Sequence, residues 1–223
     1  RLTESYKHNI RFEKVAGISR KSDGVEIKTH KNEIEIFDHV VIATHADEAL
    51  LLLEDPSLRE ENLLSKWRYT KNHAVLHNDP NLMPKRKRIW SSWNFIANGK
   101  ADQNAKVCLT YWMNRLQNIT ESKPLFVTLN PNDIIKDEAI ISQHVYTHPY
   151  FNTAALESQK DLWDIQGLNR TWFCGSYFGY GFHEDGLQSG LAVAEQLGGL
   201  SRPWSSIDMN NRIMLKSFNP AAA

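Results

Sequence analysis

The stretch from Trp172 to Gly199 reads W-F-C-G-S-Y-F-G-Y-G-F-H-E-D-G-L-Q-S-G-L-A-V-A-E-Q-L-G-G. Its first three residues, Trp172–Cys174, form a short apolar run that stops at Gly175, as expected of a buried strand. More glycines follow, and they let the backbone turn sharply or approach a ligand closely. A helix is then predicted to start near Gly186 and to end at Gly198-Gly199. The start of such a helix offers free N–H groups to an anionic or carbonyl-rich ligand, although many α/β proteins use the same order for packing alone.

The first part of the chain predicts an antiparallel meander that leads into a buried strand. Residues 1–37 alternate between apolar and polar from Ile10 onward, and Lys21–Gly24 suits a hairpin turn because Asp-Gly favours positive φ. Asp38–Thr44 is then a continuous β-branched apolar run, which predicts a strand buried on both faces of a parallel sheet. A short helix with acids in its first turn is predicted over residues 45–53.

The middle of the chain, residues 72–151, predicts an antiparallel sheet whose strands are separated by polar loops. The region is aromatic, so the sheet either lines an apolar pocket or forms a plain core. The predicted strands lie around residues 74–77, 89–95, 107–113, 125–129 and 141–147, and the aromatic residues include Trp90, Trp93, Tyr111, Trp112 and Tyr146.

The composition of the 223 residues excludes some classes of protein. With 26 basic and 26 acidic residues the net charge is zero, which argues against a dedicated nucleic-acid binder. No apolar run approaches the length of a membrane span. Cys108 and Cys174 are far apart, which favours a compartment that keeps thiols reduced, such as the cytoplasm. His144 and His148 lack a third ligand nearby, so no metal site is expected.

Two stretches resemble the flavin-containing amine oxidase superfamily, which includes protoporphyrinogen oxidase, phytoene desaturases and the Rab GDP-dissociation inhibitors. In its C-terminal motif a strand ends in a small residue and Gly, here Cys174-Gly175, and a helix begins with Gly and a small residue four places on, here Gly186 and Gly190. The sequence G-F-H-E-D-G-L-Q-S-G is similar to a bacterial branch of predicted NAD/FAD-binding, amine-oxidase-like proteins. The chain departs from the superfamily at Ser176, where an acidic residue is common.

The second resemblance is at Ala43-Thr44-His45, where the superfamily carries an A-T-G or A-T-P turn. The third position departs from that pattern, and His45 is expected to cap the following helix or to face solvent.

The resemblance implies an α/β (α+β) fold, with part of a FAD/NAD(P)-binding Rossmann-like domain and an antiparallel-sheet substrate domain. Residues 1–56 and 165–200 would belong to the FAD-binding domain, residues 57–164 to the substrate domain, and residues 201–223 to a peripheral tail. The G-x-G-x-x-G unit that would hold the ADP part of FAD is not in the sequence. The chain is therefore expected to be a fragment, about the C-terminal half, that needs the N-terminal half for full FAD binding.

The resemblance also implies FAD as the cofactor. Val15 would touch the adenine through its backbone, Ala43 and Thr44 would lie near the ribose and pyrophosphate, and the start of the last helix would approach the pyrimidine carbonyl of the flavin. The eight implied contacts are Val15, Ala43, Thr44, Gly175, Ser176, Gly186, Leu187 and Gln188. Tyr177, Tyr180 and His183 would shape the substrate side, or else only pack the loop.

The predicted function is that of an FAD-dependent oxidoreductase acting on a small molecule, either an amine or an apolar substrate such as a fatty-acyl or polyene group. The isolated fragment is expected to be inactive. Two alternatives remain open from the sequence. One is a non-catalytic binding protein on the same fold, as the GDP-dissociation inhibitors are, and the other is an α/β fragment that binds nothing alone.

Overall fold

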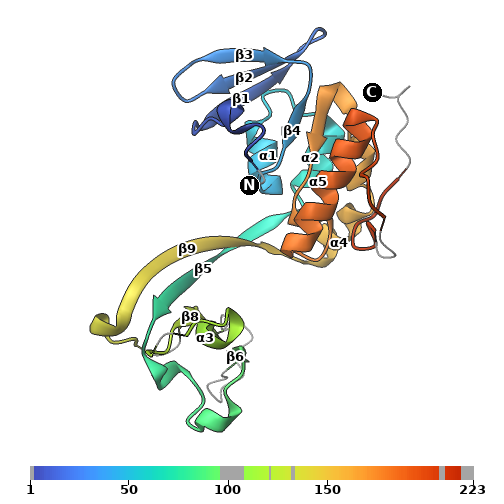
Figure 1. Ribbon diagram of the computed structural model, residues 1–223. Coiled ribbons are helices and arrows are strands. Elements are labelled where there is room, and N and C mark those ends of the chain that lie inside the picture. The colour runs from blue at the N-terminus through green and yellow to red at the C-terminus, as the bar shows by residue number, and fades with distance from the viewer. Residues whose placement is uncertain (1–2, 96–107, 121, 132–133, 206–208, 217–223) are drawn as a thin grey trace. The chain divides into compact units, whose positions relative to one another are not determined.

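The structure is a computed structural model that describes residues 3–95, 108–120, 122–131, 134–205 and 209–216 (Figure 1). Two compact units divide the chain. Unit 1 comprises residues 1–69 and 149–223, and unit 2 comprises residues 70–148. The domain limits predicted from the sequence stay a prediction.

An antiparallel meander opens unit 1, with β1 (Val15–Arg20), β2 (Val25–Thr29) and β3 (Ile34–Phe37) in that order. The predicted hairpin turn is confirmed, because the Lys21 N–H donates a 2.8 Å hydrogen bond to the Gly24 carbonyl. The expected strand start near Ile10 is wrong. Residues 7–9 form a 3-10 turn, and β1 begins only at Val15, where pairing with β2 begins.

The next strand, β4 (Val40–Ile42), pairs in parallel with β10 (Thr171–Phe173) from the far end of the chain. A parallel partner was predicted, but burial on both faces is wrong for β4, because Val41 is 43% exposed. This sheet contains two strands in the described part of the chain, and the Val41 side of β4 is open to solvent. Two short helices follow, α1 (Ala46–Leu52) and α2 (Leu58–Leu64).

His45 is the N-cap of α1, which is one of the two placements expected for it. The Glu48 carboxylate accepts a 3.3 Å hydrogen bond from the His45 N–H, and the His45 ring stacks on Tyr69 with 4.1 Å between ring centroids. The Tyr69 hydroxyl accepts a 2.9 Å hydrogen bond from the Ala46 N–H. Burial raises the pKa of Tyr69 to about 12, so this phenol stays neutral at the start of α1.

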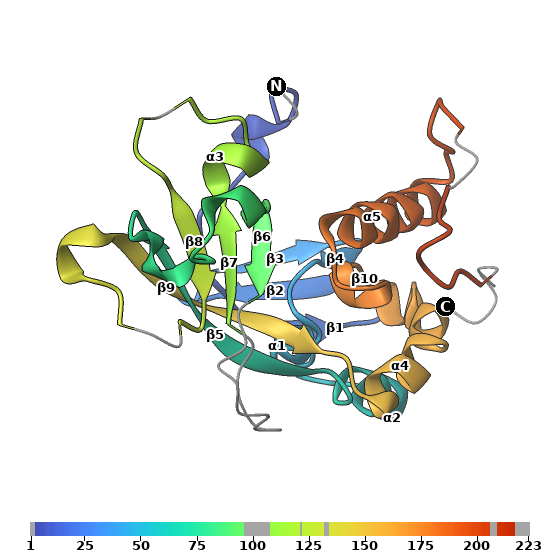
Figure 2. The ribbon, with the colours of Figure 1, turned by 90° about the horizontal axis from the view of Figure 1, so that it is seen from below.

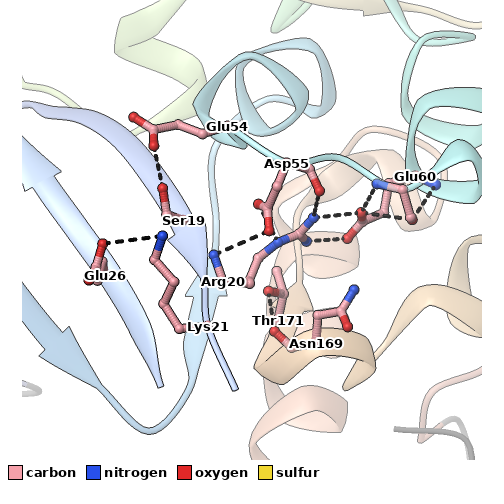
Figure 3. Close-up of polar contacts among 10 residues, drawn as sticks. Ser19, Arg20, Lys21, Glu26, Glu54, Asp55, Glu60, Asn169 and Thr171 are labelled. Atoms are coloured by element: carbon pink, nitrogen blue, oxygen red, sulfur yellow. Dashed lines mark hydrogen bonds and ion pairs between the residues drawn. The ribbon is translucent and has the colours of Figure 1, made fainter. Parts of the chain in front are cut away.

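A buried ion pair ties the meander to the helices (Figure 3). Arg20, at the end of β1, donates to Glu60 at 2.6 Å and to Asp55 at 2.8 Å, and the Arg20 and Glu60 side chains are only 3% and 1% exposed. Glu60 also accepts a 2.7 Å hydrogen bond from the Ser57 N–H and so caps α2. Burial acts to raise the pKa of Glu60, but the hydrogen bonds from Arg20 and Ser57 outweigh it and lower the pKa.

The last two helices are α4 (Thr153–Gln159) and α5 (His183–Gly198). The predicted end of α5 is confirmed, because Gly199 takes the left-handed conformation, with φ 67°, that suits a helix C-cap. The predicted start near Gly186 is wrong by three residues. Asp185, the third residue of α5, accepts a 2.7 Å hydrogen bond from the Phe182 N–H and so fixes the earlier start.

Unit 2 is organised by an antiparallel sheet, as predicted. The strand order is β6-β7-β8-β5-β9, and a short helix, α3 (Met113–Leu116), follows β7. Residues 87–89 form a 3-10 turn before β6 rather than part of it, and the predicted strand position 107 lies outside the described residues. The strands are β5 (Arg68–His77), β6 (Trp93–Phe95), β7 (Leu109–Trp112), β8 (Phe126–Leu129) and β9 (Ile140–Tyr150).

One face of this sheet is apolar, and the other combines buried polar side chains with the buried Val75 and Phe126. Directly opposed residues share a face, and the register places eight apolar side chains on one of them. That apolar face consists of Trp93, Tyr111, Val127 and Leu76 in one row and Phe95, Leu109, Leu129 and Ala74 in the next. On the other face, buried Thr128 bonds to His77 and Thr110, each at 2.8 Å. Trp93 is 59% exposed, so the apolar face is open at β6.

None of the helices in the described ranges combines the length and the apolar character that a membrane crossing requires.

Candidate functional site

The carboxyl ends of β4 and β10 lie side by side in unit 1. The Cys174 N–H donates a 3.1 Å hydrogen bond to the Ile42 carbonyl, which extends the pairing one residue beyond β10. A Cβ placed on Gly175 would lie 3.6 Å from the Thr44 carbonyl oxygen. In parallel sheets, ligands bind outside the carboxyl ends of the strands. Thr44 and Gly175, two of the implied cofactor contacts, therefore meet at the edge where a ligand is expected.

The helix α5 lies beside β10 and β4 (Figure 2). The Ser189 hydroxyl accepts a 3.0 Å hydrogen bond from the Gly175 N–H. A Cβ placed on Gly186 would lie 3.8 Å from the Ser176 nitrogen, an ordinary van der Waals distance, so the first turn of α5 lies next to the loop that follows β10. Thr44, Gly175, Ser176 and Gly186 consequently form one corner, which we call the strand-end corner.

A cleft of about 550 Å³ opens beside Thr44. Val15 of β1 lines the same cleft, so the structure brings together two implied cofactor contacts that are far apart in sequence. This volume is in the range usual for small-molecule sites. The other lining residues are Glu13, Lys14, Ala16, His30, Glu48, Leu51 and Leu52.

Three of the implied FAD contacts lie outside this corner and do not line this cleft. Ala43 is exposed at the end of β4, and Leu187 is 56% exposed on α5. Gln188 is buried, and its side-chain amide is engaged within the protein, donating to Glu184 at 2.9 Å and accepting from the Arg212 N–H at 3.2 Å. Since α5 starts at His183, Leu187 and Gln188 belong to its second turn.

The first two positions of α5 are His183 and Glu184. Their N–H groups have no carbonyl within the helix to bond, because the first turn of any helix leaves its donors free. Gly186 differs, since its N–H donates to the Phe182 carbonyl at 3.3 Å. The free N–H groups and the positive end of the helix dipole therefore belong to His183 and Glu184, which the sequence analysis had placed in the loop before the helix.

The three residues predicted for the substrate side have different environments. Tyr177 is 1% exposed and packs against Trp67 and Phe178, with ring centroids 5.7 and 4.8 Å away. Burial raises the pKa of Tyr177 well above its ordinary value, and its hydroxyl has no hydrogen-bond partner among the described residues. This placement is that of a packing residue, the alternative weighed for the loop. Tyr180, at 66%, and His183 are exposed.

Sequence reasoning missed Asp185 and Arg212. The segment after residue 200 was expected to be peripheral, but Arg212 forms a 2.6 Å ion pair with buried Asp185, and Ile213 is only 7% exposed. The available signal was the acidic residue at the third position of a helix, a usual capping residue. Nothing local to the sequence connects it to an arginine in the C-terminal segment.

No protein-family model and no curated protein matches the sequence. Solved structures do match it in fold. A CLA-producing fatty acid isomerase from P. acnes is 12% identical with a TM-score of 0.58 over 82% of this chain and 47% of its own. Putrescine oxidase bound to putrescine is 10% identical with a TM-score of 0.56 over 83% and 48%. Reduced UDP-galactopyranose mutase is 10% identical with a TM-score of 0.55 over 85% and 48%.

These likenesses are at the level of the fold. They confirm the predicted mixed α and β fold with an antiparallel second sheet. The chain spans about half the length of the structures that it matches.

Proposed function

We propose that this chain is the C-terminal portion of an FAD-dependent oxidoreductase of the amine-oxidase type. The observation that carries the proposal is the strand-end corner of Thr44, Gly175, Ser176 and Gly186, from which Thr44 also lines the cleft together with Val15. The fold likeness to putrescine oxidase and to the fatty acid isomerase supports the same assignment.

The residues at this corner fit a dinucleotide cofactor. Gly186 lies next to Ser176, because a Cβ there would make an ordinary contact of 3.8 Å with the Ser176 nitrogen. A backbone without side chains can approach a ligand closely, and the free N–H groups at the start of α5 suit negative charge. Val15 would meet the adenine through its backbone, Thr44 the ribose and pyrophosphate, and Ser176 the ribityl chain with one hydrogen bond.

FAD, when bound, supplies hydride or electron transfer. The protein supplies orientation, electrostatics and exclusion of water. The first turn of α5 favours negative charge at its amino end. Trp67, Tyr177 and Phe178 form a buried aromatic layer behind the strand-end corner, which keeps water from that side.

For the substrate, the apolar face of the unit 2 sheet favours an apolar molecule, such as a fatty-acyl or polyene group, over a small polar amine. Its eight side chains carry no charge, and Trp93 and Phe95 are 59% and 57% exposed. Large exposed apolar patches usually mark binding sites.

The test is an absorbance spectrum of the full-length parent protein beside that of chain 1–223. Flavin bands between about 350 and 500 nm are expected on the parent and not on the isolated chain, because the glycine-rich unit that would hold the ADP part of FAD lies outside this chain. Reduction of those bands by candidate amines or fatty acids would then identify the substrate class. A colourless parent that FAD cannot reconstitute would contradict the proposal and would favour a non-catalytic binding protein.

A further inference from the structure

The carboxylate of Asp185 is a buried charge at the start of α5. It is fully buried and accepts hydrogen bonds from the N–H groups of Tyr180, at 2.9 Å, and Phe182, at 2.7 Å. Its third partner is the Arg212 Nε, at 2.6 Å. A buried carboxylate is costly without a positive partner, and Arg212 is the partner that the structure provides.

Arg212 also packs on the loop that leads into α5. Its guanidinium carbon lies 5.1 Å from the ring centroid of Tyr180 and 5.5 Å from that of Phe182, distances at which a cation is attracted to an aromatic ring. Its backbone N–H donates to Gln188 at 3.2 Å. The Asp185 carboxylate raises the pKa of Arg212, so this side chain stays charged.

The Arg212 backbone also packs closely against the loop, at Gly179. A Cβ placed on Gly179 would lie 2.5 Å from an Asp185 carboxylate oxygen and 2.8 Å from the Arg212 carbonyl oxygen. The Arg212 neighbour is backbone, and the Asp185 carboxylate is held by its hydrogen bonds, so no larger residue fits there without a shift. The loop, the helix start and the C-terminal segment are therefore packed as one structure.

We propose that Arg212 is a positioning residue of the proposed flavin site. It holds residues 179–182 and the first turn of α5 in place, and it cancels the charge of Asp185 at the helix end that would face the flavin. This inference rests on the proposed function. Without Arg212, an uncompensated carboxylate would oppose negative charge near the start of α5, against the effect of the helix dipole.

The first experiment follows amide hydrogen exchange in chain 1–223. Arg212→Gln should speed exchange at residues 179–186 by about tenfold or more, because a segment held by few contacts opens more often. Arg202→Gln is the matched control. Arg202 lies in the same C-terminal segment and bonds Glu195, nearer the other end of α5, at 2.6 and 2.8 Å. Equal exchange at 179–186 in both variants and the unchanged chain would contradict the role of Arg212.

The second experiment measures the flavin midpoint potential of the full-length parent. Arg212→Gln should lower the potential, whereas Arg212→Lys, which keeps the positive charge, should restore most of it. A structural role alone would not separate the two variants in this way. A flavin-containing parent with the same potential in all three proteins would contradict only the role of Arg212. A parent without flavin would contradict that role and the proposed function together.

Discussion

The backbone N–H of Gly175 donates a 3.0 Å hydrogen bond to the hydroxyl of Ser189, which joins the end of β10 to the second turn of α5. Ser189 is fully buried and also donates to the Gly175 or the Gly186 carbonyl, at 3.1 and 3.0 Å. One hydroxyl thus fixes the distance between the strand and the helix at the strand-end corner.

Ser189→Ala should therefore lower the free energy of unfolding by about 1–3 kcal/mol, since it leaves the Gly175 N–H without its acceptor. Urea unfolding of the chain measures this difference. Ser65→Ala, on the exposed end of α2, is the control and should change stability by less than about 0.5 kcal/mol. Equal effects of the two substitutions would argue against the link between β10 and α5.

Substitution by alanine should change the stability of the protein in opposite directions at two glycines of this region. A Cβ on Gly175 would lie 2.7 Å from the Tyr177 ring, so Gly175→Ala should destabilise the protein by about 1–3 kcal/mol. A Cβ on Gly190 would have no neighbour within 4 Å, and that residue lies inside α5. Gly190→Ala should stabilise the protein by about 0.5–1 kcal/mol. Thermal unfolding of both variants decides the point, and a stabilised Gly175→Ala would contradict the packing of Tyr177.

Loss of the buried ion pair between Arg20 and Glu60 should account for much of the stability that the protein loses in acid. The pKa of Glu60 is lowered below its ordinary value of 4.5, so its contribution is complete above pH 4.5 and is lost as the pH falls through the lowered pKa. Glu60→Gln should cost up to about 3–5 kcal/mol at neutral pH, because the buried Arg20 loses its buried charge partner and keeps only the more exposed Asp55. The acid limb of its stability curve should also be flatter.

Glu4→Gln is the control for this prediction. Glu4 pairs with Lys7 at the surface, where both side chains are more than 60% exposed. Exposed pairs contribute little, so this variant should stay within about 0.5 kcal/mol of the unchanged chain. A Glu60→Gln protein of equal stability would show that the ion pair does not hold β1 to α2.

His77 should make unit 2 sensitive to mild acid. Its ring is fully buried, donates to Thr128 and accepts from the Asp79 N–H at 3.2 Å, and so is neutral. Burial lowers the pKa of His77 below 6.5, and the nearby Asp79 opposes this only in part. The stability that depends on neutral His77 is complete above pH 6.5 and is lost as the pH falls below it.

His77→Gln should remove this pH dependence, whereas His144→Gln, at an exposed position of β9, should leave it in place. Urea unfolding curves, followed by intrinsic tryptophan fluorescence at several values between pH 5 and 8, measure the free energy of unfolding of both variants. A His77→Gln protein with the same acid limb as the unchanged chain would assign the dependence to another group.

Under the proposed function, the cleft beside Thr44 should hold part of the bound FAD. Thr44→Phe would fill part of the cleft of about 550 Å³, and the full-length parent with this change should bind FAD at least about tenfold more weakly. Ile34→Phe, at a 58% exposed position of β3, is the control and should bind FAD as the parent does. Flavin retained equally by both variants would place the cofactor elsewhere.

The sequence by itself determined the local elements. Turn chemistry, apolar runs and capping act between near neighbours. They predicted the Lys21–Gly24 turn, a parallel strand within residues 38–44, the strand before Gly175 and a helix end at Gly198-Gly199. The family resemblance read from the sequence also indicated the two stretches that meet at the strand-end corner, around Thr44 and Gly175.

Only the tertiary structure decided which residues meet. It buried Tyr177 in the core, joined Val15 and Thr44 in one cleft, and paired Asp185 with an arginine 27 residues further along the chain. Such contacts depend on how whole elements pack, and the residues between them do not encode the pairing. The helix α5 starts three residues before the predicted position for the same reason, because Asp185 is held by the loop and the C-terminal segment together.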